Sequence, residues 1–535
     1  MGLLKPAIYR WAPLGVSDQR DGLSAAPGAC RFITNLIHDP TSPGVLAPRP
    51  AASQVTNFPG FTNPGYVSCM YVLGCYIFGL VASTRFPGYE EPFCYNLTTS
   101  AFMPISGVTS SNVPLAAPST GDWKPAKIAN VGNHLMIAHP GATGGNMFYY
   151  FTNITPSTIT NLTWGAGNTA TVPLPSPPTH VEMFYNRAFY VIQNQIWMSD
   201  SLDPLTITNA GQVLFIGNST DIVALASQPL TTGTQGILNG LLAFKCNSIY
   251  QITGDYSLGN LAINQLSGST GTSAPRSLAQ SPGGVLFMAL DGIRAVNLAG
   301  TISEPLPDLV YIFYNVITPS RVAAAYVADT YRICIPGTGT SLAPFAQEYW
   351  YNFKNQKWTG PHTFTYDNSV ASGQTLYMTG PSESGAIWQM NSVPSYSDSY
   401  VENGTQLNFS LTSAPFVPAP PMSEKSFVEM TFTTLPYNQT YNITVENSQG
   451  GVSSFASSLA FTPQPMTGAQ VWGQGTWGSG YWGTTPYNLG TYPLNFNAPL
   501  VFKTAMVQIA GVSGPYARIG HFTFRYTALG YTGSD

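Results

Sequence analysis

Short apolar runs alternate with two- or three-residue polar turns along most of this chain. The segment VEMFYNRAFYVIQNQIWMSD starts at Val181 with a turn expected at Asn186-Arg187, and VLFMALDGIRAVN starts at Val285 with a turn expected at Asp291-Gly292. Asp-Gly between two apolar runs is a strong signal for a β-hairpin. Further hairpins are expected from His134, Leu241, Val322, Glu348 and Thr375, three of them with turns at Asn247-Ser248, Asp329-Thr330 and Lys354-Asn355. The pattern predicts an all-β protein, since 44 Pro and 52 Gly leave little room for helices.

The predicted hairpins resemble one another in shape more than in letters, and they recur from about residue 66 to residue 391. This organisation is typical of a β-propeller, whose blades are four-stranded units of roughly 40–50 residues. We therefore expect residues 56–395 to form a propeller of about six blades, with a stack of β-sandwiches as the competing interpretation. Residues 66–82 are uncharged and nearly long enough to cross a bilayer. Gly74 and Gly79 interrupt them, which favours a β-hairpin that turns near Gly74.

Residues 396–535 have a different texture and are expected to form a C-terminal β-sandwich. Residues 426–435, SFVEMTFTTL, alternate as a half-buried strand does. The segment HFTFRYTAL near the end also alternates, with Phe522 and Phe524 on one face and Thr523 on the other.

Between these two strands lies a segment rich in Trp and Gly. Trp472, Trp477 and Trp482 are spaced by five residues, and each is followed by Gly. Neither a helix nor a strand has a period of five. We expect a long aromatic loop that lies on a surface or on a neighbouring subunit, and the three tryptophans are candidate interaction residues.

The first 55 residues have too few consecutive apolar positions for a core of their own. They hold five of the chain's 20 Lys and Arg residues. We expect an extended N-terminal arm that closes or docks the propeller. Arg20, Arg31 and Arg49 in this arm are further candidate interaction residues.

The composition also favours a β fold, and it bears on the classes of function. Only 8% of residues are charged, against roughly 25% in a typical soluble protein, while 44% are apolar. The surface must therefore consist largely of Ser, Thr, Asn, Gln, Gly and Tyr. The formal net charge of −4 gives no basic excess, so electrostatic binding of nucleic acid is not indicated.

The six cysteines contain no CxxC pair and are expected to be buried free thiols, although a disulfide between Cys69 and Cys75 across their hairpin stays open. The six histidines are scattered. His134 and His139 are five residues apart and would lie on opposite faces of a strand, so no metal or cofactor is expected.

Three patterns associated with catalysis are present without their context. A GxGxxG at Gly473, Gly475 and Gly478 has no strand and helix around it. A propeller glycosidase needs two positioned carboxylates, and nothing in the sequence pairs the candidates Glu182, Glu348, Asp200 and Asp367. The run WMSDSLDP is superficially similar to the Asp-box turn of sialidases but lacks its Gly and its trailing Trp, so Asp200 and Asp203 are interpreted as turn formers. The chain is not expected to be an enzyme.

The N-terminal block GVSDQRDGLSAAPGACRFITNLIHDPTSPGVLAPRP resembles the opening of tail nozzle proteins (tail tubular B or tail accessory proteins) of short-tailed bacteriophages. The matching positions are Gly15, Val16, Ser17, Pro27, Gly28, Cys30, Asn35, Gly44, Leu46, Arg49 and Pro50. Pro48 stands where the family usually has a basic residue. Segments such as IWMSDSLDPLTIT and YWYNFKNQKWTG are similar to later parts of the same proteins, so the resemblance spans most of the chain.

The resemblance implies a homo-oligomer, a hexameric ring below an adaptor ring, with fibres or spikes outside. Six copies would enclose an axial channel that retains the genome DNA and then conducts it during ejection, without sequence-specific binding. The chain would reside in the virion tail after assembly in the bacterial cytoplasm. In agreement, residues 1–7 contain Lys5 and no apolar stretch follows, so no secretory signal is expected.

Two alternatives remain at the level of the sequence. The chain could be another propeller-type tail component, such as a fibre-associated or receptor-binding protein. It could also be a propeller enzyme or lectin that acts on glycans. Subunit number separates the nozzle from the first alternative, since a fibre component would be expected as a trimer.

Overall fold

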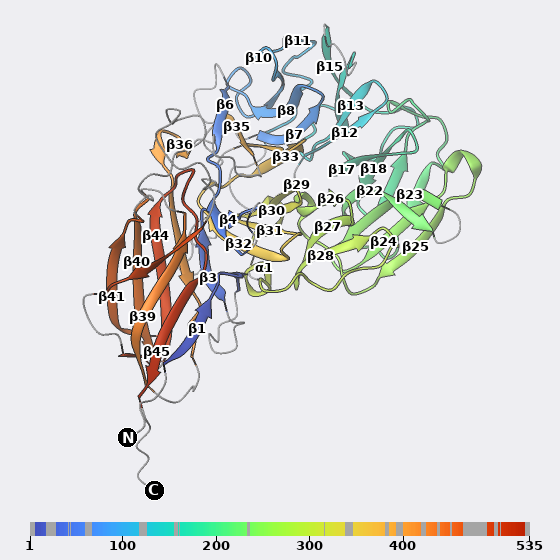
Figure 1. The fold of residues 1–535 in the computed structure, drawn as a ribbon. Coiled ribbons are helices and arrows are strands. Elements are labelled where there is room, and N and C mark those ends of the chain that lie inside the picture. The colour runs from blue at the N-terminus through green and yellow to red at the C-terminus, as the bar shows by residue number, and fades with distance from the viewer. Residues whose placement is uncertain are drawn as a thin grey trace.

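The structure is a computed structural model of the 535-residue chain. It describes residues 6–17, 28–40, 42, 44–58, 67–116, 126–154, 159, 161–232, 236–314, 316–337, 346–379, 385–391, 400–418, 424–435, 439–449, 452–463, 489–496, 501–502 and 504–529. Within these residues almost every element is a strand. A ring of small sheets and a two-layered sandwich lie side by side (Figure 1).

Seven sheets form the ring, and each is named here as a blade in chain order. Blade one contains β7 (Val67–Leu73), β8 (Tyr76–Ala82), β9 (Glu90–Asn96) and β10 (Ala101–Phe102). Blade two contains β12 (Lys127–Val131), β13 (His134–Ala138), β14 (Phe148–Thr152), β15 (Leu162–Gly167) and β11 (Ile105–Ser106). The strand pairs within the seven sheets are antiparallel except for β11 and β15, which pair in parallel. Blade three contains β17 (His180–Phe184), β18 (Arg187–Ile192), β19 (Gln195–Met198) and β21 (Val213–Phe215).

The remaining blades follow the same plan. Blade four contains β22 (Ile222–Thr232), β23 (Gly236–Lys245), β24 (Ile249–Thr253) and β25 (Ala262–Ser267). Blade five contains β26 (Ala279–Ser281), β27 (Gly284–Ala289) and β28 (Gly292–Asn297). Blade six contains β29 (Ala323–Val327), β30 (Thr330–Ile335), β31 (Gln347–Asn352) and β32 (Lys357–His362). Blade seven contains β33 (Asn368–Ser372), β34 (Thr375–Thr379), β35 (Ala386–Asn391) and β6 (Ser53–Asn57).

The ring closes through its innermost strands. Strand β7 lies beside β12, β12 beside β17, β17 beside β22, β22 beside β27 of blade five, β26 beside β29, β29 beside β33, and β33 beside β7 again. The fourth strand of blade seven comes from the N-terminal segment, because β6 pairs with β35. The chain is therefore an all-β propeller. Its described residues form seven blades, whereas about six were expected. The hairpin expected from Thr375 lies in blade seven, as β34 and β35, but no pattern in the sequence indicated that β6 completes this blade.

A β-sandwich adjoins the propeller. One sheet contains β1 (Ala7–Trp11), β45 (Phe522–Ala528), β39 (Lys425–Thr434), β42 (Gly490–Leu494) and β43 (Val501–Phe502). The other contains β2 (Gly15–Val16), β3 (Ala29–Thr34), β38 (Asn408–Ser413), β44 (Ala505–Val512), β40 (Tyr441–Gln449) and β41 (Val452–Phe461). The expected alternation of HFTFRYTAL is confirmed, because Phe522 and Phe524 are fully buried between the sheets.

Short elements complete the fold. They are the paired strands β4 (Leu36–His38) and β5 (Leu46–Pro48), β16 (Ala170–Thr171) and β20 (Thr206–Ile207), and β36 (Val401–Glu402) and β37 (Thr405–Gln406). The helices are α1 (Tyr311–Tyr314), η1 (Tyr256–Leu258), η2 (Pro275–Ser277) and η3 (Pro319–Arg321). No described helix is both long enough and apolar enough to span a bilayer.

The propeller and the sandwich share one sheet. Strand β3 pairs with β32 of blade six at Ile33 and Gly360, and with β38 of the sandwich. One ten-stranded sheet therefore runs from β29, the innermost strand of blade six, to β41 at the edge of the sandwich. One buried apolar cluster also covers both parts, and it includes Trp358 and Phe432. We call this connection the joint.

The hairpin turns test the sequence reasoning directly. The hairpin that turns near Gly74 is confirmed, as β7 and β8, and so is the turn at Lys354-Asn355. Four turns were predicted one residue too late. Three of them lie at Tyr185-Asn186, Leu290-Asp291 and Ala328-Asp329, and the fourth lies at Cys246-Asn247, where the Lys245 amide donates to the Ser248 carbonyl at 2.8 Å. In the first and third, both turn residues have positive φ, which a type I′ turn requires, and Asn or Asp occupies the second turn position instead of the first.

All six cysteines lie in the described part of the chain, and all six are free thiols. Cys69 and Cys75 therefore do not pair. Cys69 is buried on β7, and burial raises the pKa of its thiol to about 12, which makes the thiolate scarce.

Candidate functional site

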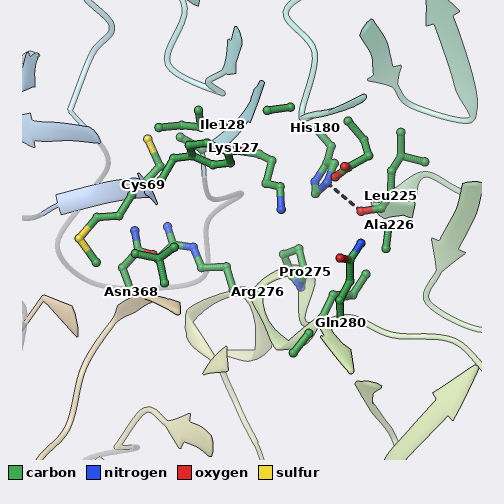
Figure 2. Close-up of a pocket in the computed structure, with 18 of the residues that line it drawn as sticks. Cys69, Lys127, Ile128, His180, Leu225, Ala226, Pro275, Arg276, Gln280 and Asn368 are labelled. Atoms are coloured by element: carbon green, nitrogen blue, oxygen red, sulfur yellow. Dashed lines mark hydrogen bonds between the residues drawn. The ribbon is translucent and has the colours of Figure 1, made fainter. Parts of the chain in front are cut away.

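A cavity of about 460 Å³ lies where the innermost strands of the blades converge. Its walls come from all seven blades, because β7, β12, β17, β22, β26, β27, β29 and β33 each contribute residues. Figure 2 shows Lys127 extending from β12 into the middle of this space. His180 and Gln280 lie on one side of it, and Arg276 and Asn368 lie on the other. We call it the axial cavity.

Lys127 and Glu182 are the charged pair that faces the cavity from neighbouring inner strands. Lys127 is half-buried, and no hydrogen bond or ion pair connects its ammonium group to another described residue. Glu182 accepts a hydrogen bond from the Ser227 hydroxyl at 3.3 Å. Burial raises the pKa of Glu182, although the Lys127 charge and this hydrogen bond oppose the effect. The net effect is that Glu182 is protonated more readily than an exposed glutamate.

His180 lies beside this pair as a neutral group. Burial and the nearby Lys127 charge hold its pKa well below the ordinary value. Its Nε2 lies 3.2 Å from the carbonyl oxygen of Leu225, so Nε2 carries the proton and donates to that carbonyl. The imidazole supports the wall between blades three and four.

Arg276 spans two further blades. It belongs to η2, and its guanidinium donates to the carbonyl oxygen of Asp367 at 2.7 Å and to that of Ser68 at 2.5 Å. These carbonyls belong to segments at blades seven and one. The side chain is thereby held in one place, with its positive charge at the edge of the cavity.

Three polar atoms of lining residues have no hydrogen-bond partner among the described residues. They are Oδ1 of Asn130, Nδ2 of Asn368 and Oγ of Ser369, and all three atoms are buried. Asn368 is 6% exposed as a whole residue. A buried polar group without a partner is unfavourable by roughly 1–3 kcal/mol, so such groups usually meet water or a ligand.

The four candidate carboxylates of a glycosidase do not gather in one place. Glu182 is the one carboxylate among the described residues that line the cavity. Glu348 on β31 is fully buried and accepts from the Arg332 guanidinium at 2.6 Å. Asp200 lies in a turn after β19 and accepts from Gln212 at 2.9 Å. Asp367 precedes β33 and is largely buried, which raises its pKa.

The interpretation of Asp200 and Asp203 as turn formers is confirmed. The two residues form an isolated bridge, and Asp203 accepts a hydrogen bond from the Leu205 backbone at 3.0 Å. His139 is buried and lies 3.0 Å from Glu90, between blades one and two. No cluster of three or more His, Cys, Asp or Glu side chains that could hold a metal occurs in the described ranges.

The candidate interaction residues have different outcomes. Arg31 is exposed on β3. Arg49 is fully buried, and Glu402, Asn35, Thr363 and the Pro50 carbonyl bind its guanidinium, so its selection as a surface residue was wrong. Its guanidinium donates instead to the carboxylate of Glu402, which is 353 positions away in the sequence. Arg20, Trp472, Trp477 and Trp482 lie outside the described residues.

Sequence reasoning missed the axial cavity. Lys127 begins the otherwise uncharged strand KIANV. A single charge at the end of such a strand was the local signal that its side chain does not lie in an apolar core. Arg276 follows a Pro in a short helical turn and had no such signal. Only the closure of the ring brings the two residues to one space.

No protein-family model matches this chain. No curated protein matches its sequence. Among solved structures, the β-propeller domain of the Trilobed protease from Pyrococcus furiosus is 8% identical over 63% of this chain and 99% of that chain, with a TM-score of 0.33. An exo-beta-1,3-galactanase from Phanerochaete chrysosporium is 10% identical over 89% of this chain and 99% of that chain, with a TM-score of 0.25. These likenesses are too distant to carry an argument, so the propeller assignment rests on sheet order and ring closure.

Proposed function

We propose that this chain is a structural subunit of a bacteriophage tail nozzle, in which copies form a ring around an axial channel that retains and then conducts genome DNA. The observation that supports this most is the place of residues 15–50. The described residues of this block, on which the resemblance depends, build the joint between propeller and sandwich through β3.

The matching residues of the block have architectural roles. Gly28 has φ +92°, and a Cβ there would lie 2.3 Å from the carbonyl oxygen of Ala12, so only glycine fits. Asn35 has φ +57°, and its side chain donates to the Asn408 carbonyl at 2.7 Å. Its Oδ1 accepts from Arg49 at 3.0 Å. Residues that hold two domains in one orientation suit a protein whose task is to keep its shape under load.

The conducting channel in this proposal lies between subunits. The axial cavity of about 460 Å³ is far too small for duplex DNA. A wall with 8% charged residues and a net charge of −4 would not hold the phosphate backbone by counterion release, so DNA could slide past it. Low charge also suits extensive contacts with like subunits, because interface cores are depleted in charged residues.

In such a tail, each neighbouring component would have a defined position. An adaptor ring would lie above the ring, fibres or spikes would attach outside, and the assembly would reside in the virion tail. The alternative of a fibre-associated or receptor-binding tail component differs in its symmetry. Electron microscopy of the purified full chain therefore tests the proposal: six-fold rings with a central channel are expected, whereas trimers or isolated monomers at micromolar concentration contradict it.

A surface variant makes the test sharper. Arg31 is exposed on β3 and is expected to contact a neighbouring subunit, so Arg31→Glu should reduce the fraction of rings at a given concentration. Arg85→Glu is the matched control, since the Arg85 side chain is 67% exposed on blade one. Equal ring fractions in both variants would remove Arg31 from the proposed interface.

A further inference from the structure

Several hydrogen-bonding groups that line the axial cavity have no partner among the described residues. The Lys127 ammonium is unpaired among the described residues, and Asn130 Oδ1, Asn368 Nδ2 and Ser369 Oγ are buried without partners. Each comes from the innermost strand of a blade, β12 or β33, and these two strands flank β7. The unmatched groups therefore belong to the two inner strands on either side of β7, and Figure 2 shows Lys127 and Asn368 among them.

The charges, donors and acceptors of these groups indicate which kind of ligand would be complementary to the cavity. Lys127 and Arg276 place two positive charges at the cavity, against the single carboxylate of Glu182. This excess favours an anion. Asn130 Oδ1 and the Glu182 carboxylate are both acceptors, however, and Asn130 Oδ1 has no donor among the described residues. A bare anion such as sulfate offers only acceptors and would leave Asn130 Oδ1 unmatched.

Size limits the ligand further. A volume of about 460 Å³ lies in the lower part of the range of small-molecule sites, which is roughly 300–1,000 Å³. The wall also contains apolar groups, among them Met70, Leu225 and Val285. A compact molecule with one acidic group and several hydroxyls matches the charge, the acceptors and the volume together.

We propose that the axial cavity is a binding site for a small sugar acid, with Lys127 binding the carboxylate and Asn130 and Glu182 accepting from hydroxyl groups. Asn368 Nδ2 and Ser369 Oγ supply further donors to ring or hydroxyl oxygens. This site is separate from the proposed nozzle contacts and does not depend on them.

Isothermal titration calorimetry of the full chain at pH 7.5 tests this with three probes: D-glucuronate, D-glucose and sodium sulfate. Glucuronate should bind at least tenfold more tightly than either of the others, because glucose lacks the charge and sulfate lacks the donors. Absence of glucuronate binding, or equal binding of glucose or sulfate, overturns the proposal.

Two variants locate the site. Lys127→Met keeps the length of the side chain and should weaken glucuronate binding at least tenfold. Lys354→Met is the matched control, since the Lys354 side chain is 70% exposed in a turn of blade six, and it should bind as the wild type does. Unchanged affinity in Lys127→Met, or an equal loss in Lys354→Met, overturns the assignment to the cavity.

Asn130→Ala keeps the proposal testable if Lys127→Met does not fold, as judged by its thermal melt. Removal of the Asn130 acceptor should weaken glucuronate about fivefold and leave the ring assembly unchanged. Unchanged affinity for glucuronate counts against the site. Because rings are scored by microscopy and the ligand by calorimetry, a failure of one proposal does not resemble a failure of the other.

Discussion

Buried charges in this chain are few, and each described one has a specific partner. Arg332 pairs with Glu348, Arg518 with Asp39, and Arg49 with Glu402, all at 2.6–2.9 Å. The pairs of Arg49 and Arg518 join segments that are far apart in the sequence. The pair of Arg332 joins neighbouring strands of blade six. Removal of one partner is more damaging than removal of a surface charge, because the other charge is left in a poorly solvated place.

Arg49→Met should therefore lower the free energy of unfolding by roughly 3 kcal/mol or more, since Glu402 would lose its partner inside the joint. Lys354→Met, which breaks the exposed pair with Asp329, should change it by about 0–1 kcal/mol. Urea unfolding of both variants measures the difference. Similar stabilities of the two would contradict the structural role assigned to Arg49.

His38 should make stability fall in acid. Burial, with a contribution from the Lys357 charge, lowers its pKa to about 4, whereas an unfolded histidine titrates near 6.5. Between these values the unfolded chain binds a proton that the native chain does not, so this contribution is present above about pH 6.5 and is lost as pH falls toward 4. The loss amounts to about 3 kcal/mol, from 1.36 kcal/mol per pKa unit.

His38→Gln cannot take up that proton. Its urea midpoint should fall less than that of the wild type between pH 7.5 and pH 4.5, and other titrating groups cancel in the comparison. An equal fall in both proteins would show that His38 does not contribute.

At the scale of elements, hairpins decide the architecture of each blade. Strand β8 is an example, because its middle residue is Gly79, where a Cβ would lie 2.3 Å from the Cys69 carbonyl and 2.7 Å from the Phe93 ring. The apolar pattern located this hairpin correctly around Gly74. The sequence could not show why Gly79 is needed, since Phe93 reaches it from the next strand, β9.

Gly79→Ala should consequently destabilise blade one by roughly 1–3 kcal/mol, the usual effect of overpacking. Gly167→Ala on β15 is the matched control, since a Cβ there meets nothing within 4 Å and its φ is not positive. That control should be neutral or slightly stabilising. Thermal melts of the two variants give the comparison, and a stable Gly79→Ala would contradict the packing described for β7, β8 and β9.

At the scale of the whole molecule, the joint should couple the propeller to the sandwich. One sheet and one apolar cluster extend through both parts, so neither can unfold without exposing the other. Differential scanning calorimetry should show one main transition for the full chain. Ile33 is fully buried and pairs with blade six, so Ile33→Ala should shift that transition to lower temperature without splitting it. Two well-separated transitions in the wild type would contradict this coupling.

The sequence by itself determined the features that depend on neighbouring residues. The alternation in HFTFRYTAL placed Phe522 and Phe524 inside a sandwich, and the turn residues located most hairpins to within one position. Such patterns are readable because strand periodicity and turn conformation are local properties.

Tertiary structure decided what depends on distant pairing. Strand β6 completes blade seven by pairing with β35 across more than 300 residues, and Arg49 is buried because Glu402 meets it there. The axial cavity likewise exists only when seven blades close and bring Lys127 near Arg276. Contacts of this kind leave no periodic trace in the sequence, because each partner satisfies its own local pattern whether or not the other is present.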